Sequence, residues 1–169
     1  MHMTKFATFF GGAQNDTESK EYKDSVRIGE ILHDKGYHVK NGGYRGLMEA
    51  VSKGAKEKGG TVLGYTCKTF GSTKGNKFLS MNIECKDIFA RLDGLITSDL
   101  FVVEKGGIGT ISELFLILDI IRKMDKKPPV FLIGEHWESI MSPVKDFMNK
   151  KEHDIYEIIK DVEQLKHKI

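Results

Sequence analysis

Short apolar runs alternate with longer amphipathic segments along the whole chain. A short apolar run bounded by glycine or polar residues predicts a buried strand, whereas apolar positions spaced three or four residues apart predict a helix. We expect strands at residues 6–10, 37–40, 61–65, 100–103, 129–133 and 155–159, with the last at a sheet edge. We expect helices at 19–35, 44–58, 88–97, 110–124 and 135–149, with a short helix at the end of the chain.

The regular alternation of strand and helix determines the expected fold class. It favours a mostly parallel sheet with helices on both faces, joined by right-handed crossovers. The chain has 169 residues without an internal repeat or a linker-like change in composition, which suits one compact domain spanning 1–169. We therefore predict a single-domain, Rossmann-like three-layer α/β/α fold.

One segment fits neither element. Residues 66–80 are polar and rich in Gly, Ser, Thr and Lys. A loop of this length is more often functional or mobile than a simple connection, so residues 67–80 are a candidate lid.

Composition and charge exclude several classes of function. The net charge of +2 gives no overall field that would attract nucleic acid, and no stretch approaches the roughly 20 apolar residues of a membrane span. Cys67 and Cys85 lack metal-knuckle spacing, and the six histidines lack metal-ligand spacing, so we expect no metal site. The start of the chain shows no secretory signal, which favours a cytoplasmic protein with reduced thiols.

Three glycine clusters follow predicted strands, where parallel sheets bind their ligands. Glycine lets backbone amides approach a phosphate closely, because a residue without a Cβ can take a positive φ and leave room for the phosphate oxygens. A helix N-terminus adds partial positive charge. The third cluster opens the helix predicted at 110–124. The expected phosphate- or nucleotide-binding residues are Gly11, Gly12, Gly42, Gly43, Gly106, Gly107, Gly109 and Thr110.

The residues after the third cluster allow two interpretations. Thr110 and Glu113 have the Thr-x-x-Glu spacing of a capping box, in which each side chain satisfies an end amide of the helix. Alternatively, Glu113 acts on a ligand bound at the turn. The residues alone leave both interpretations open.

The run Gly106-Gly107-Ile108-Gly109-Thr110-Ile111-Ser112-Glu113 resembles the signature of the LOG ("lonely guy") phosphoribohydrolases, also labelled possible lysine decarboxylases. Gly11-Gly12, residues 42–48, Gly60, Arg91 and residues 129–137 extend the resemblance over most of the chain. The resemblance implies a Rossmann-like homodimer that hydrolyses the N-glycosidic bond of a nucleoside 5′-monophosphate to base and ribose 5-phosphate. It implies Glu113 and Arg91 as catalytic residues and no cofactor.

The sequence departs from the family pattern at three positions. Lys105 replaces the usual proline of the signature, Leu92 replaces the lysine that follows the arginine, and Glu49 replaces a glycine. The extra charge of Lys105 supports an alternative, a carrier protein of the same fold that binds a nucleotide or the pterin phosphate of molybdenum cofactor without cleaving it. A true lysine decarboxylase has little support, since we recognise no pyridoxal-phosphate lysine motif.

The helix predicted at 110–124 is apolar on nearly all sides. One stripe comprises Leu114, Ile117, Leu118 and Ile121, and a second comprises Phe115, Leu116 and Ile120. A helix of this kind is buried on nearly all sides, which independently favours packing against a second subunit.

Overall fold

The computed structural model describes residues 3–14 and 16–169 and contains a seven-stranded parallel sheet of order β4-β3-β2-β1-β5-β6-β7. The strands are β1 (Lys5–Phe10), β2 (Tyr37–Asn41), β3 (Val62–Cys67), β4 (Met81–Cys85), β5 (Leu100–Val103), β6 (Val130–Ile133) and β7 (Glu157–Ile159). The helices are α1 (Lys20–Asp34), α2 (Leu47–Glu57), α3 (Ile88–Ile96), α4 (Ile108–Ile121), α5 (His136–Lys145) and α6 (Val162–Lys168). The predicted Rossmann-like α/β fold is confirmed.

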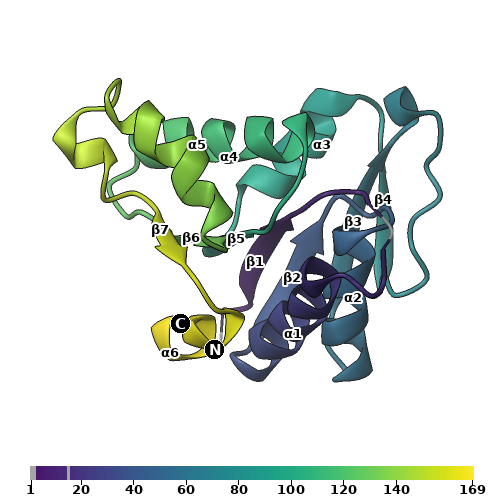
Figure 1. The fold of residues 1–169 in the computed structure, drawn as a ribbon. Coiled ribbons are helices and arrows are strands. Elements are labelled where there is room, and N and C mark those ends of the chain that lie inside the picture. The colour runs from purple at the N-terminus through teal and green to yellow at the C-terminus, as the bar shows by residue number, and fades with distance from the viewer. Residues whose placement is uncertain (1–2, 15) are drawn as a thin grey trace.

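Helices cover both faces of the sheet (Figure 1). One apolar core joins the sheet to α1, α2 and α6, and it includes Phe9, Ile28 and Val51. The other core joins the sheet to α3, α4 and α5, and it includes Phe101, Leu114 and Trp137. The two cores lie between the central sheet and the helix layers on its two faces, as expected of a three-layer α/β/α protein.

The topology switches direction at β1, which pairs with β2 on one side and with β5 on the other. After β1 the chain continues to α1 on one face of the sheet, and after β5 it continues to α4 on the other face, so the two connecting segments run in opposite directions. Backbone bonds hold these ends together beyond the strands: the Gly12 amide donates to the Lys105 carbonyl at 3.0 Å, and the Glu104 amide donates to the Phe10 carbonyl at 2.8 Å. Ligands of open α/β sheets bind in the crevice at such a point.

The segment after β3 differs from the prediction. Residues 81–85 form edge strand β4, which we did not predict because its residues are mostly polar or exposed. The preceding loop contains the short 3₁₀ helix η1 (Lys68–Phe70) and forms hydrogen bonds with the turn that follows β2. Tyr44 donates to the carbonyl of Ser72 at 2.8 Å, and the Asn76 amide donates to the carbonyl of Gly43 at 2.8 Å. The loop is therefore anchored at several points along its length.

Smaller differences concern the residues at which two helices begin or end. Helix α4 begins at Ile108, two residues before its predicted start, and α5 ends at Lys145 before a second 3₁₀ helix, η2 (Lys150–Glu152).

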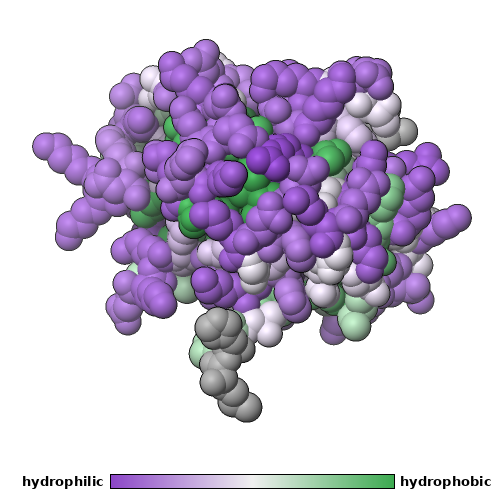
Figure 2. Space-filling model, turned by 90° about the horizontal axis from the view of Figure 1, so that it is seen from below, coloured by the Kyte–Doolittle hydropathy of each residue, from purple (hydrophilic) through white to green (hydrophobic). Residues whose placement is uncertain are grey.

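Within the described residues, no helix has the length and apolarity needed to cross a membrane. The face seen in Figure 2 is mainly hydrophilic, with hydrophobic residues gathered near its middle.

Candidate functional site

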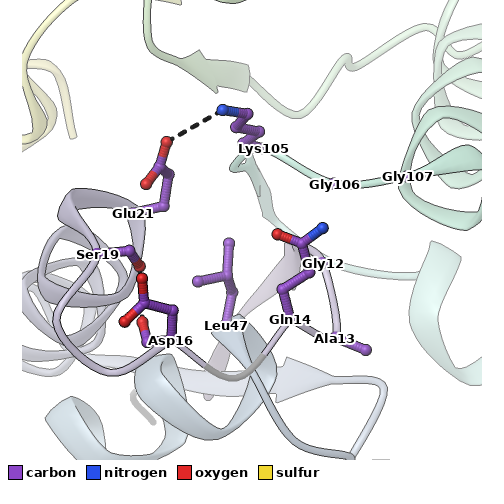
Figure 3. A pocket seen from close by; sticks show the side chains of 10 residues that line it. All are labelled: Gly12, Ala13, Gln14, Asp16, Ser19, Glu21, Leu47, Lys105, Gly106 and Gly107. Atoms are coloured by element: carbon purple, nitrogen blue, oxygen red, sulfur yellow. Dashed lines mark hydrogen bonds and ion pairs between the residues drawn. The ribbon is translucent and has the colours of Figure 1, made fainter.

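A cavity of about 710 Å³ lies at the topological switch point. Its walls come from the turn after β1, the start of α1, the start of α2 and the turn after β5 (Figure 3). Leu47 projects toward it from α2, and Lys105 and Glu21 reach toward each other along one side. The lining residues are Gly12, Ala13, Gln14, Asp16, Ser19, Glu21, Leu47, Lys105, Gly106 and Gly107. The first and third glycine clusters thus border one cavity.

The turn from β5 to α4 leaves space for a ligand at Gly107. A Cβ added at Gly107 would meet nothing within 4 Å, whereas one at Gly106 would lie 2.1 Å from the Thr110 hydroxyl. None of the three glycines of this turn, Gly109 included, has a positive φ, so positive φ plays no part here. Gly106 is needed for close packing, and Gly107 leaves the helix N-terminus open.

The second cluster and Gly11 have different local roles. Gly43 has a φ of +81° and donates its amide to the Asn41 side chain at 2.8 Å, so its position requires a glycine. A Cβ at Gly11 would lie 2.7 Å from the ring of Phe9. Neither Gly11 nor Gly43 borders the cavity. Both glycines therefore determine the local backbone at the ends of β1 and β2 without lining the cavity.

Arg91 extends from the first turns of α3 to the carboxyl ends of β2 and β3. It is 6% exposed, and its guanidinium donates to the Tyr65 carbonyl at 2.8 Å and to the Gly42 carbonyl at 3.4 Å. The guanidinium carbon also lies 5.1 Å from the ring centre of Phe70 in η1. A Cβ at Gly42 would lie only 2.1 Å from Nη2 of Arg91. Gly42 is therefore the position that allows the guanidinium to lie against the backbone.

Glu113 pairs with Arg91, and the capping-box interpretation is wrong. The N-cap of α4 is Gly107, which makes no side-chain cap bond, so Thr110 lies inside the first turn of the helix. Nη1 of Arg91 instead donates to Oε1 of Glu113 at 3.2 Å. Burial raises the pKa of Glu113 above its usual value, and the Arg91 charge and hydrogen bond oppose that rise. The structure thus brings together the two residues predicted to be catalytic.

The Arg91–Glu113 pair and the cavity involve helices on opposite faces of the sheet. Arg91 and Glu113 come from α3 and α4, whereas the cavity is walled by α1 and α2, and neither residue of the pair lines it. The turn at Gly106 and Gly107 lies between them.

Sequence reasoning missed the acidic residue at the end of β5. Glu104 is 2% exposed, and one carboxyl oxygen accepts the Lys105 amide at 2.8 Å. Burial raises its pKa to about 8. The signal that could have found it is a glutamate directly after the apolar run 100–103, next to a strand predicted to be buried.

Replacing Glu104 with glutamine should make the protein less sensitive to alkaline pH. Because the carboxyl has a pKa of about 8 when folded and 4.5 as its reference value, the folded state binds its proton more tightly. Its contribution to stability is complete below pH 4.5 and is lost as the pH rises through 8. From pH 4 to pH 9, the unfolding free energy of the wild type should fall by on the order of 4 kcal/mol more than that of Glu104→Gln.

Urea unfolding of both proteins at the two pH values measures this difference. Glu57→Gln, at an exposed position near the end of α2, is the control and should show no such difference from the wild type. A Glu104→Gln variant with the same pH dependence as the wild type would show that Glu104 is ionised in the folded protein.

Among the described residues, no group of three or more His, Cys, Asp or Glu side chains converges to hold an ion.

Comparison with known proteins shows which family the chain resembles. Residues 6–164 match the sequence model of the SLOG cluster4 family. An uncharacterized protein of Archaeoglobus fulgidus is 35% identical over 126 residues, which cover 73% of this chain and 81% of that protein.

Solved structures are similar over nearly the whole chain. The X-ray structure of TM1055, a structural-genomics target, has a TM-score of 0.76 and 29% identity, covering 98% of this chain and 100% of that one. The molybdenum cofactor binding protein of Rippkaea orientalis has a TM-score of 0.75 and 23% identity, covering 97% and 94%. At that identity the second likeness establishes the fold alone.

Proposed function

Since the chain belongs to the SLOG cluster4 family, which confirms the LOG-like resemblance, we propose that it is a nucleoside 5′-monophosphate phosphoribohydrolase. It binds the phosphate at residues 106–110 and hydrolyses the N-glycosidic bond, releasing base and ribose 5-phosphate. The observation that carries this proposal is the buried Arg91–Glu113 pair, with its 3.2 Å contact, in which Glu113 lies on the helix that begins at the phosphate turn.

Phosphate binding rests on the N-terminus of α4. The first amides of a helix have no partner within it, and they carry the positive end of the helix dipole. Gly107 leaves these amides accessible because nothing lies within 4 Å of its Cβ position. The amides of Ile108, Gly109 and Thr110 donate to the phosphate oxygens, as is general for anions at helix N-termini.

Hydrolysis uses Glu113 in the next turns of the same helix, about 9 Å along the axis from Gly107. The Glu113 carboxylate stabilises the positive charge that develops on the sugar C1′ and orients the attacking water. Water forms the new C1′–O bond and loses a proton, while the C1′–N bond breaks and the departing base takes up its electron pair and a proton. Arg91 donates a hydrogen bond to Glu113 and therefore positions the carboxylate.

This reaction requires no metal and no organic cofactor, because water and the carboxylate supply the chemistry. A nucleoside monophosphate is the proposed partner, and a cytoplasmic location remains a prediction.

A carrier function is the second candidate, and the position of the main cavity favours it. The 710 Å³ cavity lies on the α1 side of the turn and is not lined by Glu113. A ligand held there, such as a nucleotide or a pterin phosphate, would stay intact. Mass spectrometry of small molecules that co-purify with the protein separates the candidates: an intact ligand supports the carrier, and ribose 5-phosphate or free base supports the enzyme.

Gly107→Ala should weaken phosphate binding while leaving the fold intact. The backbone of Gly107 is extended, and its Cβ position is unobstructed, so alanine costs only the difference in N-cap preference, about 1 kcal/mol or less. The methyl group occupies space at the phosphate turn, and we expect at least a tenfold loss of nucleoside monophosphate affinity, about 1.4 kcal/mol.

Titration calorimetry measures the affinity, and thermal melting measures the fold. Ser112→Ala, at an exposed position of the same helix, is the control and should bind as the wild type does. Wild-type affinity in Gly107→Ala would place the phosphate elsewhere.

A homodimer through the outer face of α4 is part of the proposal. Leu114, Ile117 and Ile121 face the sheet and are buried, whereas Phe115, Leu116 and Ile120 are only half-buried in the single chain. Leu116→Glu should convert a dimer to a monomer, because the charge would be buried at the interface. Sedimentation velocity checks this result, with Gln164→Glu at an exposed position of α6 as the control, and a wild-type protein that sediments as a monomer would contradict the dimer.

A further inference from the structure

A second cavity, of about 260 Å³, lies next to the first at the carboxyl ends of β5 and β6. Glu21 lines both cavities, and its contact with Lys105 at 3.3 Å lies between them. The lining residues are Lys20, Glu21, Asp24, Glu104, Ile133, Gly134, Glu135, His136 and Lys160. Nothing in the proposed hydrolysis uses this space.

Two buried polar atoms at this cavity have no hydrogen-bond partner. Leu100 and Val102 face the core on the α1 side, so the alternation of β5 points Glu104 toward the same side. Oε1 of Glu104 accepts the Lys105 amide, but Oε2 is buried without a partner. Nε2 of His136, which also lines this cavity, is likewise buried and unpartnered. Buried polar groups are nearly always satisfied, so two unsatisfied atoms around one cavity indicate a missing ligand.

We propose that this cavity is a binding subsite for a heteroaromatic ring with an amino group beside a ring nitrogen, as in adenine, recognised by the carboxyl group of Glu104.

The hydrogen-bonding pattern selects this class of ring. The pKa of about 8 keeps Glu104 neutral near pH 7, so the carboxyl offers one O–H donor and one carbonyl acceptor. Oε1 already accepts a backbone amide, which leaves the proton on Oε2. Oε2 then donates to the ring nitrogen while Oε1 accepts from the amino group. A purine that lacks the amino group offers the ring nitrogen alone and leaves the Oε1 acceptor without this donor.

The surrounding charges determine how binding depends on pH. Lys20, Glu21 and Asp24 face the carboxyl from α1, Lys105 lies next to it in the turn, and Glu135, His136 and Lys160 complete the lining. The pKa of His136 is lowered by burial, and those of Lys20 and Lys160 are raised above 10.5. Those of Glu21 and Glu135 are lowered. Among these shifted groups, Glu104 is the one that titrates between pH 7 and 9.

A base without phosphate tests the subsite separately from the phosphate turn. Titration calorimetry with 9-methyladenine should show binding to the wild type that is about tenfold weaker at pH 9 than at pH 7, because the protonated fraction falls accordingly. Glu104→Gln, whose amide also has one donor and one acceptor, should bind equally at both pH values. Glu104→Met should bind at least tenfold more weakly at pH 7, and 9-methylpurine, which lacks the amino group, should bind more weakly than 9-methyladenine to the wild type.

Three results would overturn the proposal: no binding of 9-methyladenine to the wild type, wild-type affinity in Glu104→Met, or binding of 9-methylpurine as tight as that of 9-methyladenine. Thermal melting of each variant confirms that it is folded, and Glu135→Gln controls for a charge change at the exposed rim. Because the probe carries neither phosphate nor ribose, failure here leaves the proposed hydrolysis standing, and the reverse also holds.

Discussion

Replacing Glu113 with glutamine lowers the rate of base release by a factor of about 10² to 10⁴. Glutamine keeps the shape of the side chain and can still accept the hydrogen bond from Arg91, but it loses the negative charge that stabilises C1′ in the transition state. Because the phosphate turn is unchanged, the dissociation constant of the nucleoside monophosphate should stay within about threefold, a difference below 1 kcal/mol. A stability loss of about 1–3 kcal/mol is expected, because Arg91 is 6% exposed and keeps its charge.

Steady-state kinetics with titration calorimetry measures these effects, and Glu57→Gln at an exposed position is the matched control. In the wild type, activity should rise with pH through the pKa of Glu113, which burial raises above 4.5. Full activity in Glu113→Gln would remove this residue from the mechanism. Loss of ligand binding together with activity would assign Glu113 to binding instead.

Gly42→Ala should disable the same pair by a steric route. Its new Cβ would lie 2.1 Å from Nη2 of Arg91 and 2.7 Å from the sulfur of Met48. The buried guanidinium has to move, so its 3.2 Å contact with Glu113 is lost or lengthened. We expect a stability loss of about 1–3 kcal/mol and a large fall in turnover.

A double-mutant cycle with Arg91→Lys tests the cause. Lysine lacks the Nη2 atom that meets the new methyl group, so Gly42→Ala should cost at least about 1 kcal/mol less in the Arg91→Lys background than in the wild type. Urea unfolding of the four proteins measures the coupling. Additive effects would show that Gly42 acts through something other than Arg91.

The strands with continuous apolar runs could be predicted from the sequence because burial on both faces leaves a clear pattern. The run at 100–103 became β5 with the predicted bounds, and the run at 129–133 became β6. The edge strand β4 could not be predicted in this way, because Met81, Asn82 and Glu84 are exposed and its ladder with β3 depends on backbone pairing. An edge strand with one partner carries little hydrophobic signal.

The candidate site was predictable in part. Resemblance singled out Arg91 and Glu113, and the structure places them in contact across 22 residues of sequence. The start of α4 was misplaced by two residues, and that error made a capping box plausible. The Glu104 cavity could not be predicted, because it depends on how α1, β5 and β6 meet in space.

Incubation of the wild-type protein with a panel of nucleoside 5′-monophosphates, followed by chromatography for free base and ribose 5-phosphate, tests the central claim most directly. We predict equal amounts of both products from at least one member of the panel, with release reduced at least a hundredfold in Glu113→Gln. The contradicting result is a nucleotide that raises the melting temperature but yields no free base, which would establish binding without hydrolysis.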